Sequence, residues 1–146
     1  ALQVTHCEFL IRGVKSLTEE AMKNSWAEYD SDKVYLRGYC MSPGVWFLRY
    51  STYVLLKVKY TLHKGDMDDD VQWPFQHKIR MSIIHPGQTA DRELEFKPDP
   101  NDSCNQRPNT SNGAVVYRKK NIILEHLIRE GYVDNDQFRI KFELLP

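Results

Sequence analysis

The segment Trp73-Pro74-Phe75 decides the fold that this sequence predicts. Proline fixes its own φ and disfavours helical geometry in the residue before it, so Trp73 is expected to be extended. The segment stands between an acidic stretch, residues 66–70, and the alternating run Ile79–Ile83. Two large rings are therefore presented rigidly just before a strand, which indicates an anchor for a hydrophobic core.

The patterns on both sides of this segment are typical of strands. Apolar and polar residues alternate along two long runs, Val54–Leu62 and Phe138–Leu144, and along shorter ones at Cys7–Ile11, Val34–Cys40 and Leu94–Phe96. Such alternation indicates a strand with one face in a core. Because clusters of Gly, Pro, Asn and Asp separate the runs, the sequence predicts an all-β protein, an antiparallel sandwich or barrel.

Two short helices are expected between the strands. Ser16-Leu17-Thr18-Glu19 has the pattern of a capping box, which predicts a helix of about ten residues starting at Ser16. A second helix is expected to begin near Asn121 and to stop at Gly131. Residues 41–53, which hold four aromatic side chains, are interpreted as a loop, and so are residues 97–112.

Length and composition limit the classes of function. The 146 residues predict a single domain over 1–146, and 20 basic against 20 acidic residues give no electrostatic reason to expect nucleic acid as a partner. No apolar run is long enough to insert into a membrane. Three widely spaced cysteines favour a reducing, cytoplasmic location, while the glycosylation triplets at Asn101 and Asn109 keep a secreted protein open.

No motif for catalysis or for a cofactor is visible. The acidic stretch matches the first ligands of an EF-hand calcium loop, but Val71 and His77 stand where that loop needs glycine and glutamate. The histidines lack the spacing of zinc hydrolases, and no phosphate-binding loop is present. We therefore predict no catalytic residue, no metal and no cofactor, although a Cys–His pair formed in three dimensions stays open.

Three ordered segments resemble one family. The WPF segment with the following Lys78–Ile84 resembles the C-terminal domain of TNF-receptor-associated factors, the TRAF or MATH domain. Phe96–Asp99 leading to Gln106–Pro108 is similar to the family's F-R-P-D and F-Q-R-P segments, and Gly131–Ile140 is similar to its Y-V-x-D-D-x-x-F-I pattern. The resemblance covers essentially the whole chain and implies an eight-stranded antiparallel β-sandwich.

The resemblance also implies a function. It is that of a non-catalytic adaptor domain, which binds short peptide motifs in cytoplasmic tails of TNF-receptor-type receptors or in signalling proteins by adding a strand to a sheet edge. A homotrimer formed through a coiled coil is implied for the full-length protein, and so is a RING ubiquitin-ligase domain for many members. Two alternatives stay open: a MATH substrate-recognition domain of a ubiquitin ligase or deubiquitinase, and a secreted adhesion or sugar-binding module.

The expected peptide-binding residues follow from the family's motifs. Arg37 and Tyr39 match its L-R-x-Y pair, and Phe96 matches a phenylalanine of the binding pocket. Ser103 falls in the loop where many members carry a serine trio. The edge strand that offers its backbone to the peptide corresponds to Gly113, Ala114 and Val115. Lys59 replaces an aromatic of some members, and we expect it to favour an acidic or polar peptide side chain.

Overall fold

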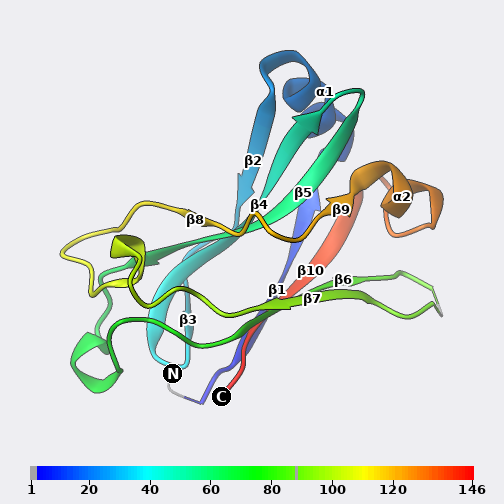
Figure 1. The fold of residues 1–146 in the computed structure, drawn as a ribbon. Coiled ribbons are helices and arrows are strands. Elements are labelled where there is room, and N and C mark those ends of the chain that lie inside the picture. The colour runs from blue at the N-terminus through cyan, green and yellow to red at the C-terminus, as the bar shows by residue number, and fades with distance from the viewer. Residues whose placement is uncertain (1–2, 88) are drawn as a thin grey trace.

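The structure, a computed structural model, describes residues 3–87 and 89–146 as two antiparallel sheets packed face to face (Figure 1). One sheet has the strand order β1, β10, β6, β7, with β1 (His6–Arg12), β10 (Gln137–Leu144), β6 (Ile79–Ile84) and β7 (Arg92–Phe96). The other has the order β2, β4, β5, β8, with β2 (Trp26–Asp30), β4 (Tyr39–Tyr50), β5 (Tyr53–His63) and β8 (Val115–Val116). Two short strands complete this second sheet: β3 (Val34–Leu36) pairs with β4, and β9 (Ile122–Ile123) pairs with β5.

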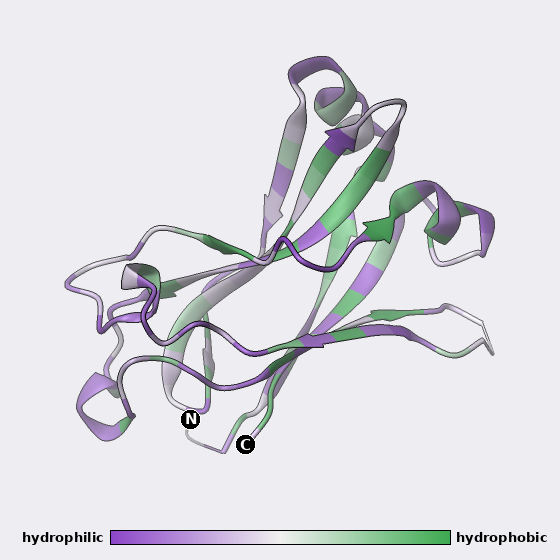
Figure 2. Ribbon diagram, viewed as in Figure 1, coloured by the Kyte–Doolittle hydropathy of each residue, from purple (hydrophilic) through white to green (hydrophobic). Residues whose placement is uncertain are grey.

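The predicted all-β antiparallel sandwich with two short helices is therefore confirmed, but the implied number of eight strands is too low. Ten strands are present in the described residues, because β3, β8 and β9 are short pieces of two or three residues. The core lies between the sheets and takes alternate residues from each strand, as Figure 2 shows along β10. In β10, Phe138, Ile140 and Phe142 are buried, whereas Arg139 is exposed.

Both helices are present, but their starts differ from the prediction. Helix α1 (Val14–Asn24) begins two residues before Ser16, after a left-handed Gly13, and no side chain of its first residue caps it. Instead, the carboxylate of Asp136 accepts a hydrogen bond from the Lys15 amide at 2.8 Å. Helix α2 (Leu124–Arg129) is only six residues long, since Ile122 and Ile123 pair with β5 before it starts.

Two segments were assigned wrongly from their patterns. Val34–Cys40 is not one strand, because Arg37 and Gly38 adopt positive φ of 48° and 87° and turn the chain from β3 back along itself into β4. Residues 41–53 are not a loop, because most of them form β4, the strand between β2 and β5. Of the aromatic residues there, Phe47 is fully buried, and Tyr50 and Tyr53 pair across the hairpin with ring centroids 5.6 Å apart.

The WPF segment forms the anchor that the sequence predicts. Phe75 is fully buried and its ring lies 4.9 Å from that of Tyr39 and 5.6 Å from that of Tyr60. Trp73 donates its indole N–H to the carbonyl oxygen of Asp68 at 3.0 Å, so the acidic stretch is tied to the same place. Asp68 itself is 3% exposed, which departs from the expectation of a solvated turn.

Candidate functional site

The two-residue strand β8 ends the second sheet and is the natural place for an additional strand. It pairs with β5 on one side, Val115 opposite Tyr60 and Val116 opposite Lys59. The amide of Tyr117 donates to the carbonyl oxygen of Val58 at 2.9 Å, which makes these two residues a hydrogen-bonded pair. Because bonds alternate in an antiparallel ladder, the N–H and C=O of Val116 point away from β5. A peptide lying beside β8 would meet these groups.

The loop before β8 is held in place from below. The short 3-10 turn η2 (Ser103–Asn105) lies under the segment, and the Asn112 side chain donates to the carbonyl oxygens of Cys104 at 2.9 Å and Gln106 at 2.8 Å. Gly113 is close enough to this turn that a Cβ on it would lie 3.4 Å from the Cys104 sulfur. Burial and the nearby Asp102 raise the pKa of the Cys104 thiol, which is thus kept in its neutral form. Ser103, Gly113 and Ala114 are exposed and share this end of the sheet.

Phe96 belongs to the same end but works from inside. It is 5% exposed, and Tyr117 stacks on it with centroids 4.2 Å apart. Tyr60 lies 6.5 Å away on its other side and donates its hydroxyl to the Asn105 side chain at 2.7 Å. Phe96 therefore supports the residues on both sides of β8 rather than offering its own ring to solvent.

The outer face of the sheet beside β8 carries positive charge. Arg118 lies over the Trp46 ring, 4.9 Å from its centroid, and is followed by Lys119 and Lys120, all three exposed. Lys57, only 5% exposed, donates to the Arg118 carbonyl oxygen at 2.9 Å and to the Asn121 side chain. Burial and the Arg118 charge lower the pKa of Lys57.

The expectation for Lys59 is wrong, because its charge is already neutralised within the protein. Its ammonium lies 2.5 Å from the Glu28 carboxylate and 2.9 Å from that of Asp30, both on β2. Burial alone would lower the pKa of Lys59, but the two carboxylates outweigh it and raise the value. Arg118 and Lys119, in contrast, form no ion pair within residues 3–87 and 89–146.

His63 fastens the start of the edge segment. One ring nitrogen lies 2.8 Å from the Ser42 hydroxyl on β4, and the other lies 2.7 Å from the Ser111 hydroxyl just before β8. Burial, followed by the charge of Lys33, lowers the pKa of His63. The ring therefore joins the middle of the sheet to its edge. Nothing in the sequence spacing of these three residues reveals the contact.

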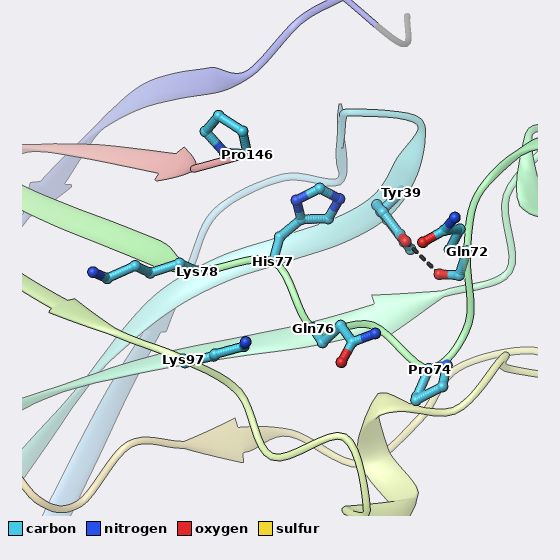
Figure 3. Close-up of a pocket in the computed structure, with 8 residues that line it drawn as sticks. All are labelled: Tyr39, Gln72, Pro74, Gln76, His77, Lys78, Lys97 and Pro146. Carbon is cyan, nitrogen blue, oxygen red and sulfur yellow. Dashed lines mark hydrogen bonds between the residues drawn. The ribbon is translucent and has the colours of Figure 1, made fainter.

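Arg37 and Tyr39 lie elsewhere, at the turn between β3 and β4. Arg37 donates its Nε–H to the Leu144 carbonyl oxygen at 2.9 Å, near the end of β10. Tyr39 is 2% exposed, donates its hydroxyl to the Gln72 carbonyl oxygen and packs against Trp73 and Phe75. Tyr39 also lines a hollow of about 520 Å³ at this end of the sandwich (Figure 3). The structure thus brings together Phe96, Ser103 and residues 113–115, but not the other two.

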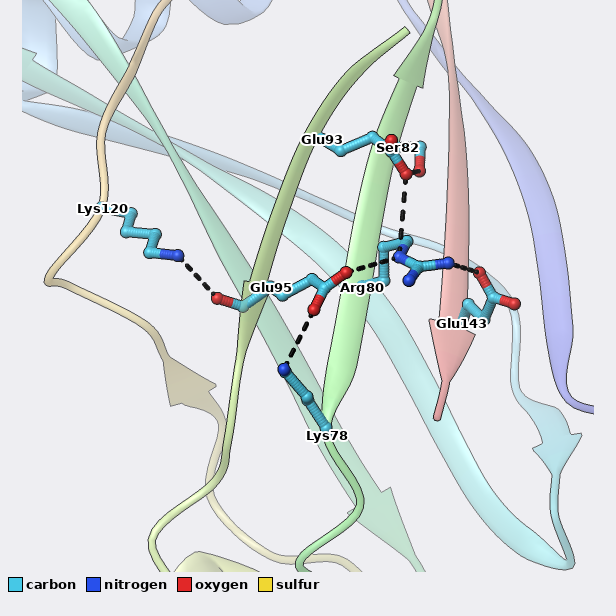
Figure 4. A network of polar contacts seen from close by, with 7 residues as sticks. All are labelled: Lys78, Arg80, Ser82, Glu93, Glu95, Lys120 and Glu143. Carbon is cyan, nitrogen blue, oxygen red and sulfur yellow. Dashed lines mark hydrogen bonds and ion pairs between the residues drawn. The ribbon is translucent and has the colours of Figure 1, made fainter. Parts of the chain in front are cut away.

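The outer face of the first sheet is a network of paired charges (Figure 4). Arg80 on β6 lies 2.8 Å from Glu95 and 3.5 Å from Glu143, and Lys78 lies 3.1 Å from Glu95. Lys120 reaches across from the second sheet and donates to the Glu95 carbonyl oxygen at 2.9 Å. That contact ties the chain after β8 to the free edge of β7.

Comparison with known proteins decides the family. A sequence profile described as TRAF/meprin, MATH domain, matches residues 30–141. The chain belongs to the TRAF/meprin MATH domain family. Among curated proteins, this MATH domain is similar to human (Homo sapiens) TNF receptor-associated factor 5, with 26% identity over 90 residues, which are 59% of the chain and 16% of the relative. The solved structure of Notothenia coriiceps TRAF5 has the same fold, with a TM-score of 0.80 and 23% identity over 97% of this chain and 73% of that one.

The family supports a protein-interaction role for this MATH domain, as an adaptor module of the non-catalytic kind that the TRAF domains represent. In the described ranges, no group of three or more His, Cys, Asp or Glu side chains is arranged to hold a metal ion. None of the helices in those ranges is long and apolar enough to cross a membrane.

Proposed function

We propose that this MATH domain binds a short extended peptide, which adds as a further strand along β8. The observation that carries the proposal is the position of Val116, whose backbone N–H and C=O point outward from the end of a six-stranded sheet. Strand addition uses such groups for affinity and leaves the side chains to set specificity. Ser103, Gly113, Ala114 and Val115 would lie along the peptide, and Phe96 would support it through Tyr117.

The preferred peptide carries an acidic side chain. Arg118 and Lys119 are exposed beside β8 and have no carboxylate partner among the described residues, whereas the nearby Lys59 has two. An unpaired guanidinium held over an aromatic ring is well placed to accept a carboxylate in a charge-assisted hydrogen bond. The acidic preference is therefore assigned to Arg118 in place of Lys59.

In the whole protein, the domain would act as an adaptor without catalytic activity of its own. The name of the human relative describes a factor associated with a TNF receptor, and we extend this role to cytoplasmic tails of TNF-receptor-type receptors or to related signalling proteins. One domain spanning residues 1–146 would present one peptide site. Trimerisation by a coiled coil would turn weak single contacts into strong binding to clustered tails.

A proline at position 116 tests strand addition directly. Val116→Pro removes the outward N–H but no hydrogen bond to β5, and proline is tolerated on edge strands where the N–H faces solvent. Peptides are first selected by display on the wild-type domain, and their affinities are then measured by fluorescence polarisation. We expect Val116→Pro to weaken binding at least tenfold with an unchanged thermal midpoint, and Val116→Thr, which keeps the N–H, to bind like wild type. Equal affinities of the proline and threonine variants would refute strand addition at β8.

A further inference from the structure

We propose that a second surface, the cleft beside the WPF segment, accepts an acidic side chain of a peptide. This cleft is lined by Tyr39, Gln72, Pro74, Gln76, His77, Lys78, Lys97 and Pro146 and has a volume of about 520 Å³ (Figure 3). A volume of this size lies within the range of small-ligand pockets, about 300–1,000 Å³. The inference does not depend on the β8 site, because it concerns a different surface and different residues.

The lining of the cleft is basic. Lys78 and Lys97 line it and no acidic residue does. Lys78 is partly neutralised by Glu95 at 3.1 Å, but Lys97 is exposed and forms no ion pair with any part of the chain that the structure describes. Figure 3 shows Lys97 pointing toward Gln76, while Lys78 points away toward β7. Lys97 is thus the cation that an incoming carboxylate would meet.

A smaller hollow extends this charge to Arg37. It has a volume of about 310 Å³ and shares Tyr39, Gln72 and His77 with the larger one. Arg37 uses its Nε–H on the Leu144 carbonyl oxygen, which leaves the terminal N–H groups of its guanidinium for other partners. Asp70 is the acidic residue of this hollow, so across the two hollows three cations face one carboxylate.

The floor of the cleft is rigid, which lowers the cost of binding. Tyr39 packs edge-on against Trp73, Phe75 and His77, with centroid distances of 5.1, 4.9 and 5.6 Å. His77 is fixed by a 2.9 Å hydrogen bond from its Nδ1–H to the Leu145 carbonyl oxygen. Side chains that are already ordered lose little conformational entropy when a ligand arrives. The exposed amides of Gln72 and Gln76 can bond the peptide backbone around the acidic residue.

The test uses two blocked tetrapeptides, acetyl-Ala-Glu-Glu-Ala-amide and its neutral counterpart acetyl-Ala-Gln-Gln-Ala-amide, titrated into the isotope-labelled 146-residue chain and followed by NMR. We expect the acidic peptide to shift the amide signals of Gln76, His77 and Lys97 saturably, and the neutral peptide to leave them in place. Lys97→Gln should weaken the acidic peptide about fivefold, the loss of one charge-assisted contact. Gln76→Glu should weaken it further by repulsion, and Lys15→Gln, at an exposed lysine of α1, should change nothing.

Three results would overturn the inference. The first is an equal response to the neutral peptide, and the second is an unchanged affinity in Lys97→Gln. The third is a saturable response of the same signals to sulfate at matched ionic strength, which would identify an inorganic-anion site. Val116→Pro separates the two surfaces: it should leave the cleft signals responsive, so a loss of β8 binding and a loss of cleft binding are read independently.

Discussion

Tyr117 stacks on Phe96 with ring centroids 4.2 Å apart and ring planes inclined by 12°. Phe96 ends β7, at the edge of the first sheet, and Tyr117 follows β8, at the edge of the second. The pair therefore joins the two sheets at the place where we propose that a peptide adds. Lys120 reinforces this junction through the Glu95 carbonyl oxygen at 2.9 Å.

Removing the Tyr117 ring should lower both stability and peptide affinity. Aromatic pairs contribute about 0.5–1.5 kcal/mol beyond the area they bury. With the burial added, we expect Tyr117→Ala to lower the free energy of unfolding by about 2 kcal/mol in urea titrations. Tyr117→Phe keeps the ring and is the matched control. If the alanine and phenylalanine variants unfold at the same urea concentration, the stack has no role in holding the edge.

The ion pairs of Lys59 predict an order of stabilities. Removing both carboxylates, in the double variant Glu28→Gln with Asp30→Asn, leaves a nearly buried ammonium without a counter-charge, which should cost about 2–3 kcal/mol of unfolding free energy. Lys59→Met removes the charge itself and should cost less. Chemical denaturation of both variants gives the comparison. A methionine variant less stable than the double variant would contradict the account of Lys59.

His63 predicts a dependence of stability on pH. Burial lowers the pKa of His63 below its usual value near 6.5, so the folded state binds fewer protons than the unfolded state in the window just below about 6.5. The stabilisation is therefore complete above that window and is lost as the pH falls through the lowered pKa. We expect His63→Asn to reduce the loss of unfolding free energy between pH 7.5 and pH 5.0. His6→Asn, at an exposed position of β1, controls for the removal of an imidazole; an equal effect of both variants would count against His63.

Arg118 predicts how affinity depends on peptide charge and on salt. Arg118→Gln should weaken an acidic peptide selected on the wild type about fivefold and flatten the decrease of affinity with ionic strength. A version of the peptide with glutamine in place of its acidic residue should bind the wild type and the variant equally. Lys57→Met is a second test, since Lys57 holds the Arg118 carbonyl oxygen at 2.9 Å and so positions the guanidinium. Wild-type affinity in Arg118→Gln would move the acidic preference to another residue.

The local patterns of the sequence were enough to predict the strands and the WPF anchor. The period of two along Val54–Leu62 and Phe138–Leu144 reports directly on which side chains face the core. The segment 41–53 was misread because Pro43 and Gly44 are rare inside strands. In the structure Gly44 is needed there, because a Cβ at this position would lie 2.5 Å from the Tyr29 carbonyl oxygen of the neighbouring strand.

Contacts between residues far apart in the sequence were not predictable in the same way. The capping of α1 depends on Asp136, 121 residues away from Lys15, and the neutralisation of Lys59 depends on the pairing of β2 with β4. The turn at Arg37 and Gly38 did have a signal, since glycine readily adopts the positive φ of 87° found there. Reading that glycine as a turn would have separated Arg37 and Tyr39 from the edge strand.

The backbone amide of Val116 provides the most direct test of strand addition. Its exchange with solvent deuterium is measured by NMR on the free domain and on the domain saturated with a selected peptide. We predict fast exchange in the free domain, because this N–H points away from β5, and at least tenfold slower exchange in the complex. The amide of Tyr117, which already donates to Val58 at 2.9 Å, serves as the internal reference. Unchanged exchange of the Val116 amide under full saturation would contradict peptide binding at β8.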